Sequence, residues 1–192
     1  MAPRSRGRRG PSIPQRKRIY IGCEGRAEVE YARWLQDLVN ESHKQFHLST
    51  KDLHGGGNPI HMLEIALKDR ARQQALSRFH ASALLLDADT CSGASEIVAD
   101  ANRRAKKHGF IIVWQCPCGE GFLLRHVRGL RAAAEQSARE ARDDFRRTFN
   151  REPPLELHEI RGHFGRVGND MLLEVAGSTE GFQELLHQLR LP

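Results

Sequence analysis

The stretch Ser82-Ala83-Leu84-Leu85-Leu86-Asp87-Ala88-Asp89 decides the fold expected of this chain. Its short apolar run predicts a strand buried on both faces of a sheet, and polar residues follow where the run stops. Two similar runs, at residues 18–23 and 110–114, predict two more strands. Between and beside these runs, apolar residues recur at helical spacing, which predicts helices over residues 27–42, 60–78 and 95–107. This alternation predicts an α/β fold with an open, mostly parallel sheet flanked by helices.

The remaining sequence extends the same domain. Residues 121–149 are predicted to be mostly helical, with Gly129 as a break, and residues 179–190 to form a last amphipathic helix. The run Leu155 to Ile160 is predicted to be a further strand. We therefore expect residues 18–192 to form a single domain.

The N-terminal residues differ in composition from everything after them. Of the 30 Lys and Arg residues, seven lie in residues 1–18, which contain no Asp or Glu; the rest of the chain then holds 23 basic against 24 acidic residues. Residues 1–17 are predicted to be a disordered basic arm. Such an arm suits attraction to nucleic acid, and it equally suits a solvated leader that only aids solubility.

Several classes of protein are excluded by composition. No apolar run approaches the roughly 20 residues that span a membrane, and no apolar stretch follows the basic N-terminus as in a secretory signal. The four cysteines, at positions 23, 91, 116 and 118, have no secretory context. We expect reduced thiols in a cytoplasmic protein.

Acidic residues follow each of the three predicted strands. Glu24 follows the first, Asp87 and Asp89 the second, and Glu120 lies in the polar turn after the third. Sites in open α/β sheets lie beyond the carboxyl ends of strands, and clustered carboxylates suit Mg²⁺ or Mn²⁺. The alternative is structural, because an Asp at a strand end often caps the next helix. Glu28, at a helix start, is a secondary candidate that also suits the helix dipole.

Three blocks of sequence carry a resemblance to a known family. They are Ile21-Gly22-Cys23-Glu24-Gly25 with Glu28 and Tyr31, then Leu84-Leu85-Leu86-Asp87-Ala88-Asp89, then Cys116-Pro117-Cys118-Gly119-Glu120 with the run Gly121 to His126. In this order the blocks resemble the RloB-like family, whose members look like small proteins with a Toprim-type fold. The resemblance covers roughly residues 18–128.

The resemblance implies a Toprim-like, Mg²⁺-dependent nuclease, a hydrolase that cleaves nucleic acid in phage defence. Asp87 and Asp89 would bind the metal, and Glu24 would be a further ligand or the general acid/base. Glu120 would complete the acidic pocket, and His126 would assist proton transfer or contact phosphate. DNA and RNA both remain open as substrates, a homodimer is one assembly considered, and no membrane partner is expected.

A second class of function stays open. A non-catalytic nucleic-acid-binding or sensor module could keep the fold and act with a defence partner protein. Arg125 and Val127, which flank His126, depart from the run usual in the family, and this favours the module. Cys116 and Cys118 could also suggest zinc, but their spacing is tighter than in zinc pairs and no second pair follows, which favours a shaped turn.

Overall fold

The four strands pair side by side in the order β2-β1-β3-β4, and all neighbours are parallel. Their bounds are Lys17–Cys23 for β1, Phe46–Asp52 for β2, Phe79–Asp87 for β3 and Ile111–Gln115 for β4. The computed structural model describes residues 15–43, 45–54, 57–75, 77–88, 95–127, 136–164 and 169–191. Within them, the predicted open parallel sheet flanked by helices is confirmed.

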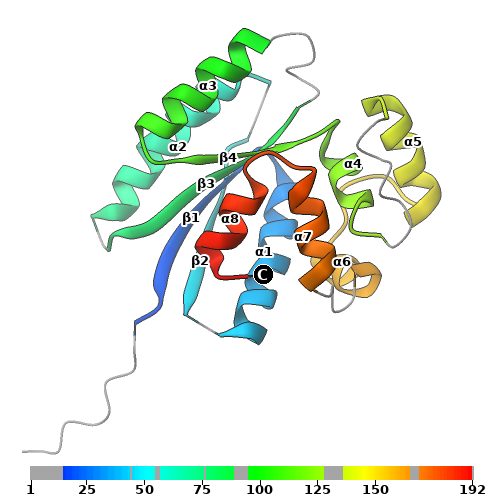
Figure 1. The fold of residues 1–192 in the computed structure, drawn as a ribbon, viewed down its shortest axis with the longest axis horizontal. Coiled ribbons are helices and arrows are strands. Elements are labelled where there is room, and N and C mark those ends of the chain that lie inside the picture. Colours follow the sequence, from blue (N-terminus) through cyan, green and yellow to red (C-terminus); the bar gives the residue numbers. More distant parts are fainter. Residues whose placement is uncertain are drawn as a thin grey trace, which may run out of the picture.

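Helices cover both faces of the sheet (Figure 1). On one face lie α2 (Pro59–Gln74) and α3 (Ser95–Lys107). On the other lie α1 (Arg26–Ser42), α6 (Leu157–Phe164), α7 (Asn169–Gly177) and α8 (Phe182–Leu189). The short α4 (Gly119–Leu124) and α5 (Ala138–Phe149) lie beyond the carboxyl end of β4.

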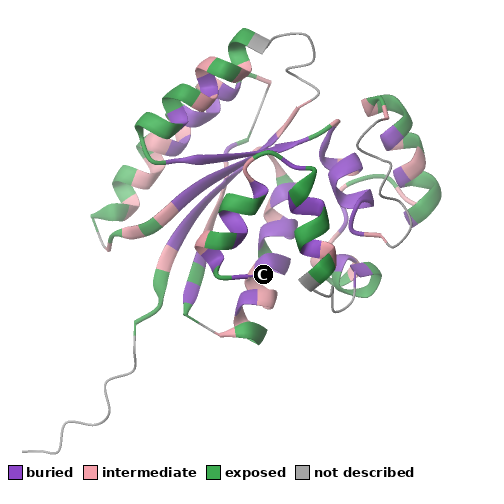
Figure 2. Cartoon of the chain, in the orientation of Figure 1, coloured by how far each residue is buried: buried purple, intermediate pink, exposed green. Residues whose placement is uncertain are grey.

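Alternation along the strands divides the apolar side chains between two cores. Ile19 and Ile21 of β1 pack with α1 and the C-terminal helices, whereas Tyr20 between them packs with α2 and α3. Successive side chains of a strand point to opposite faces, so a strand covered on both sides must be apolar throughout. Figure 2 shows the central strands buried along most of their length. The three predicted strands are those with this double coverage.

Local signals set several helix ends. The side chain of Asn58 accepts hydrogen bonds from the backbone N–H groups of Ile60 and His61, and Pro59 occupies the first turn of α2. Ser137 and Glu140 form a reciprocal capping box at the start of α5. These caps hold α2 beside the sheet and α5 beside the turn after β4.

Some sequence predictions were wrong. Residues 157–160, predicted to be part of a strand, form the start of helix α6. The expected long helix over 121–149 is divided, since α4 ends at Leu124 and α5 begins at Ala138; the predicted break at Gly129 lies outside the described residues. Strand β2 and helix α7 were not predicted.

The N-terminal boundary falls slightly earlier than predicted. Residues 1–14 of the predicted disordered arm lie outside the described residues. Lys17 is the first residue of β1, and the Arg16 guanidinium donates a hydrogen bond to Asn40 Oδ1 at 2.8 Å. Residues 16 and 17 therefore belong to the fold. Among the helices of the described segments, none is both long and apolar enough to cross a membrane.

Candidate functional site

The carboxyl ends of all four strands meet at one edge of the sheet. In the register, Cys23 of β1 lies between Asp52 of β2 and Leu85 of β3, and Asp87 of β3 lies beside Gln115 of β4. Because β1 and β3 are direct neighbours, the acids that follow them come together. The backbone N–H of Asp87 donates to Glu24 Oε2 at 2.8 Å.

An open pocket of about 460 Å³ lies at this edge. Its carboxylates are those of Glu24, Glu28, Asp52, Asp87 and Glu120, and its other polar side chains are Arg26 and His54. Leu123, Pro153 and Pro154 form an apolar part of the wall. The pocket thus brings together three of the predicted acids with two more that the prediction ranked low or missed.

Glu28 is the most deeply buried of these acids, with 6% of its surface exposed. It lies in the first turn of α1, where its Oε2 accepts the backbone N–H of Gly25 at 2.9 Å. Burial raises its pKa from 4.5 to about 7; the neighbouring Glu24 and Glu120 act in the same direction, and backbone hydrogen bonds oppose them. Glu28 therefore changes charge near neutral pH.

Gln115 connects two of the acids. Its side chain is 1% exposed. With the amide nitrogen turned toward the carboxylates, it donates to Glu28 Oε1 at 2.9 Å and to Asp87 Oδ1 at 3.0 Å. A Cβ on Gly119, at the start of α4, would lie 3.1 Å from each of the same two oxygens. Gln115 and Gly119 together fix the positions of the Asp87 and Glu28 carboxylates.

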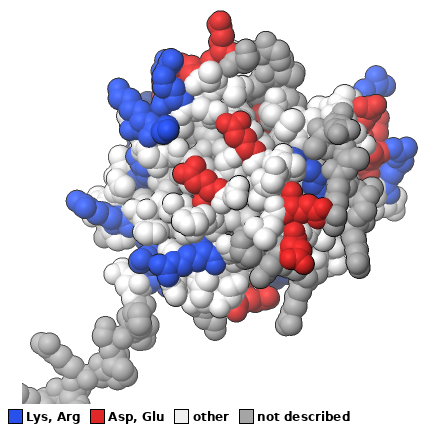
Figure 3. Space-filling model, viewed as in Figure 1, with Lys and Arg blue, Asp and Glu red and all other residues white. Residues whose placement is uncertain are grey.

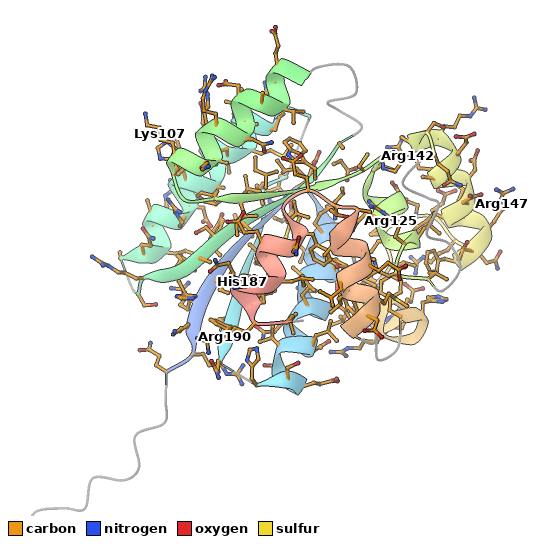
Figure 4. All side chains as sticks on the ribbon, in the orientation of Figure 1. Lys107, Arg125, Arg142, Arg147, His187 and Arg190 are labelled. Carbon is orange, nitrogen blue, oxygen red and sulfur yellow. The ribbon has the colours of Figure 1, made fainter. Side chains whose placement is uncertain are left out.

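Glu120 lies in the first turn of α4 and faces the pocket from the opposite side to α1. Its side chain is 15% exposed, and the Arg142 Nε of α5 lies 3.7 Å from Glu120 Oε2. Figure 4 shows Arg142 on α5, beyond the end of β4. The ion pair ties α5 to the wall of the pocket.

His126 lies in the core and does not line the pocket. Its Nε2 is 3.0 Å from the Tyr31 hydroxyl and its Nδ1 is 3.0 Å from the Phe122 carbonyl oxygen. Its ring stacks on Phe164, and burial lowers its pKa to about 3. Both ring nitrogens have partners inside the protein, so this placement gives His126 a structural role in the core.

Asp89, the remaining predicted ligand, lies outside the described residues. Within the segments that are described, no three His, Cys, Asp or Glu side chains are arranged to hold a metal ion, and this includes Cys116 and Cys118. Cys116 is exposed, and burial raises the pKa of Cys118 to about 12. The oxygen donors of Glu24 and Asp87 nevertheless fit Mg²⁺ or Mn²⁺ chemically.

Two residues of the site were missed by the sequence analysis. Asp52 ends a strand that was not predicted, and Gln115 is the last residue of β4. The alternation of Phe46 and Leu48 with polar residues, followed by Asp52, was the available signal for the first. Nothing in the sequence indicated that the Gln115 side chain would contact Glu28.

Comparisons of this chain with protein-family models, with curated proteins and with solved structures found no match. The residues of the pocket and the resemblance to RloB-like proteins are therefore what point to its function.

Proposed function

We propose that this protein is a Toprim-like, metal-dependent nuclease that hydrolyses phosphodiester bonds of nucleic acid. The observation that carries the proposal is the convergence of Glu24, Glu28, Asp87 and Glu120 in one open pocket. The pocket lies at the carboxyl ends of adjacent parallel strands, where open α/β sheets bind their ligands. The neighbouring positions of β1 and β3 support the Toprim-like assignment.

The charge of the pocket favours a cation. Five carboxylates and only two basic side chains line it, so a phosphodiester would meet a repulsive field there. In the proposal, Glu24 and Asp87, with Asp89, hold Mg²⁺ or Mn²⁺. The ion would neutralise charge on the phosphate and activate water.

The other residues of the pocket hold or move groups around that centre. Gln115 fixes the Asp87 carboxylate, and Arg26, which also pairs with Glu156, provides a guanidinium at the wall for a phosphate oxygen. In hydrolysis, the water oxygen forms a bond to phosphorus while the bond from phosphorus to the leaving oxygen breaks. The water proton passes to a carboxylate of the wall, and the leaving oxygen takes up a proton.

The biological setting proposed here follows from the resemblance to RloB-like proteins. In that setting the nuclease acts in phage defence, alone or with a partner protein. The arginine-rich N-terminal sequence supports nucleic acid as the substrate, because cations near phosphates raise the rate of encounter.

A non-catalytic binding or sensor module is the second candidate. Glu28 and Glu120 lie in the first turns of α1 and α4, where carboxylates stabilise a helix without any ligand. The core position of His126 and the absence of a three-residue metal group among the described side chains also favour this candidate.

A cleavage assay separates the two candidates. Labelled DNA and RNA are incubated with the full chain in Mg²⁺ or Mn²⁺, with Glu24→Gln, Asp87→Asn and Asp89→Asn as test variants. Glu64→Gln, which changes an exposed glutamate of α2, is the matched control. Cleavage by the wild type and the control, lost in the test variants, supports the nuclease.

The same proteins are then tested for metal binding. Mg²⁺ should raise the melting temperature of the wild type and of the control, because a ligand that binds only the folded state stabilises it. It should not do so in Asp87→Asn. Absence of both cleavage and a Mg²⁺ effect in the wild type would reject the nuclease and favour the module.

A further inference from the structure

The charges of the folded domain are separated between the two edges of the sheet. The carboxylates gather where the strands end, whereas basic side chains gather where the strands begin. Figure 3 shows Lys and Arg concentrated at the left, around the end of α3 and the strand starts, and intermixed with Asp and Glu at the right. In Figure 4, Lys107 and Arg190 lie on the first side, and Arg142 and Arg147 lie on the second.

Six basic residues lie at the amino ends of the strands and in the helix ends beside them, and we call this set the amino-edge surface. They are Arg18, Lys68, Arg70, Arg72, Arg78 and Lys107. Two of them bridge neighbouring elements: Arg18 donates to Gln73 Oε1 at 2.8 Å and to the Ser77 carbonyl oxygen at 3.4 Å, and Arg70 donates to the His108 carbonyl oxygen at 3.1 Å. The group therefore spans β1, the end of α2 and the end of α3.

The positive charge of this surface is not neutralised by carboxylates. No ion pair joins any of the six to an Asp or Glu within the described segments, and the hydrogen-bond acceptors of Arg18 and Arg70 are neutral oxygens. Asp69 lies among them and offsets one of the six positive charges; its Oδ2 accepts a hydrogen bond from the neutral Gln73 amide. Asp100 of α3 is paired with Arg103 and Arg104.

Two of the guanidinium groups are held in place by aromatic rings. Arg18 lies 4.3 Å from the ring centre of Phe79, and Arg70 lies 4.3 Å from that of Phe110. Stacking and neutral hydrogen bonds restrict these side chains before any partner binds, which reduces the entropy lost on binding. Nε and both terminal nitrogens of Arg18 already donate within the fold, so the exposed Lys68, Arg72, Arg78 and Lys107 are the groups that would meet phosphate oxygens.

Helix stabilisation explains only part of the group. Cations in the last turn of a helix interact favourably with its dipole, and this applies to Arg72 of α2 and Lys107 of α3. Arg18 lies within strand β1, and Arg78 precedes β3. The hydrogen bonds and ring contact of Arg18 account for its position in the fold, whereas the exposed Arg78 needs a different explanation.

We propose that the amino-edge surface is a second nucleic-acid-binding site, separate from the carboxylate pocket. The chain enters the fold at this edge through Lys17, so the arginine-rich residues 4–9 precede the surface directly in the sequence. A seven-residue strand separates the two edges by about 20 Å. The surface therefore retains nucleic acid near the protein and does not itself present it to the pocket.

The absence of apolar anchors favours nucleic acid over a membrane or a protein partner. Among the described residues, the large apolar side chains that are exposed are Ile97 and Leu173. Ile97 is ten residues before Lys107 in α3, about 15 Å away along the helix, and Leu173 is in α7 on the other face of the sheet. Membrane-bound helices and protein interfaces both use apolar contacts, whereas backbone phosphates require only distributed cations.

Charge-removing variants of the full chain test this site. Lys68→Gln, Arg72→Gln, Arg78→Gln and Lys107→Gln are combined, all at exposed positions. The matched control combines Arg139→Gln, Arg146→Gln, Arg147→Gln and Arg161→Gln, which are also exposed and remove the same net charge. Binding of fluorescein-labelled duplex DNA is measured by anisotropy at several salt concentrations, in EDTA.

The amino-edge variant should bind at least about tenfold more weakly than the control variant at low salt. Its plot of log K against log salt should be shallower than that of the wild type by about 3.6, because each of the four lost phosphate contacts contributes about 0.9 to the slope. A version that keeps the charges, with Lys68→Arg, Arg72→Lys, Arg78→Lys and Lys107→Arg, should retain the wild-type slope.

Equal losses in the two charge-removing variants would overturn the proposal, since only net charge would then matter. Unchanged binding in both, or wild-type binding to phosphatidylserine vesicles but not to DNA, would also overturn it. The single change Arg78→Glu repeats the test if the fourfold variant does not fold. Because EDTA removes divalent metal, the result is independent of whether the pocket cleaves nucleic acid.

Discussion

Replacing Glu28 by Gln should remove a large part of the pH dependence of stability. Folding raises the pKa of this carboxyl from 4.5 to about 7, mainly by burial. Between these pH values the folded protein binds a proton that the unfolded chain has released, so the free energy of unfolding falls as pH rises. The loss is complete above pH 7 and amounts to about 3 kcal/mol. A glutamine side chain cannot titrate, so the free energy of unfolding of Glu28→Gln should not fall over this pH range.

The assay is urea unfolding of the full chain in metal-free buffer at pH 5 and pH 8. The free energy of unfolding of Glu28→Gln, relative to wild type, should increase by about 2–3 kcal/mol between these two values. The free energy of unfolding of the variant is compared with that of the wild type at each pH, because His126 contributes a pH dependence of opposite sign to both proteins. The exposed Glu64→Gln serves as the control. Parallel pH profiles for wild type and Glu28→Gln would refute the assignment of a raised pKa to this buried carboxyl.

Three further changes test the fold and the pocket. Gly181→Ala should destabilise the protein by about 3 kcal/mol or more in urea unfolding, because Gly181 has φ +78° and a Cβ would lie 1.9 Å from the Ile112 carbonyl oxygen. In the wild type, acidification from pH 6.5 to 3 should lower the free energy of unfolding by roughly 4 kcal/mol, because the histidine of the unfolded chain takes up a proton and the folded His126, with its pKa lowered to about 3, does not. His126→Phe should lack this loss. An unaltered acid limb in thermal melts of this variant would count against the buried neutral imidazole. Gly119→Ala should weaken Mg²⁺ binding at least fivefold by calorimetry, because the added methyl group would displace the Asp87 and Glu28 oxygens. If the variant binds Mg²⁺ with wild-type affinity, the placement of these two oxygens does not affect metal binding.

The strands that could be predicted from the sequence are those whose side chains are buried on both faces of the sheet. The runs around Ile19–Ile21, Leu84–Leu86 and Ile111–Val113 are buried on both sides and read as continuous apolar segments. β2 is an edge strand with only Phe46 and Leu48 buried, so its sequence is mostly polar. The other edge strand, β4, is buried at all five positions and was predicted, so the weak signal of β2 comes from the exposure of its own side chains.

The error at residues 155–160 came from the length of the pattern. Leu155, Leu157 and Ile160 look like a short strand when only six residues are considered. Ile160 and Phe164 are buried on one face of α6, and Leu157 packs beside them, which is a helical spacing. A strand and the first turn of a helix cannot be distinguished over so short a stretch.

The sequence by itself determined the class of fold, the parallel sheet and the presence of acids after its strands, because burial and turn signals are local properties of the chain. Only the tertiary structure decided which of those acids meet. The strand order places β1 beside β3 and brings Glu24 to Asp87, while the turn after α4 directs His126 into the core. Charge is also arranged by the tertiary structure. Residues 19–192 are nearly neutral by count. Because α2 and α3 run antiparallel to the strands, their basic last turns lie at the amino edge of the sheet, whereas the carboxylates lie at the carboxyl edge. Side-chain direction and long-range neighbours depend on how the elements pack, and no short stretch of sequence contains that information.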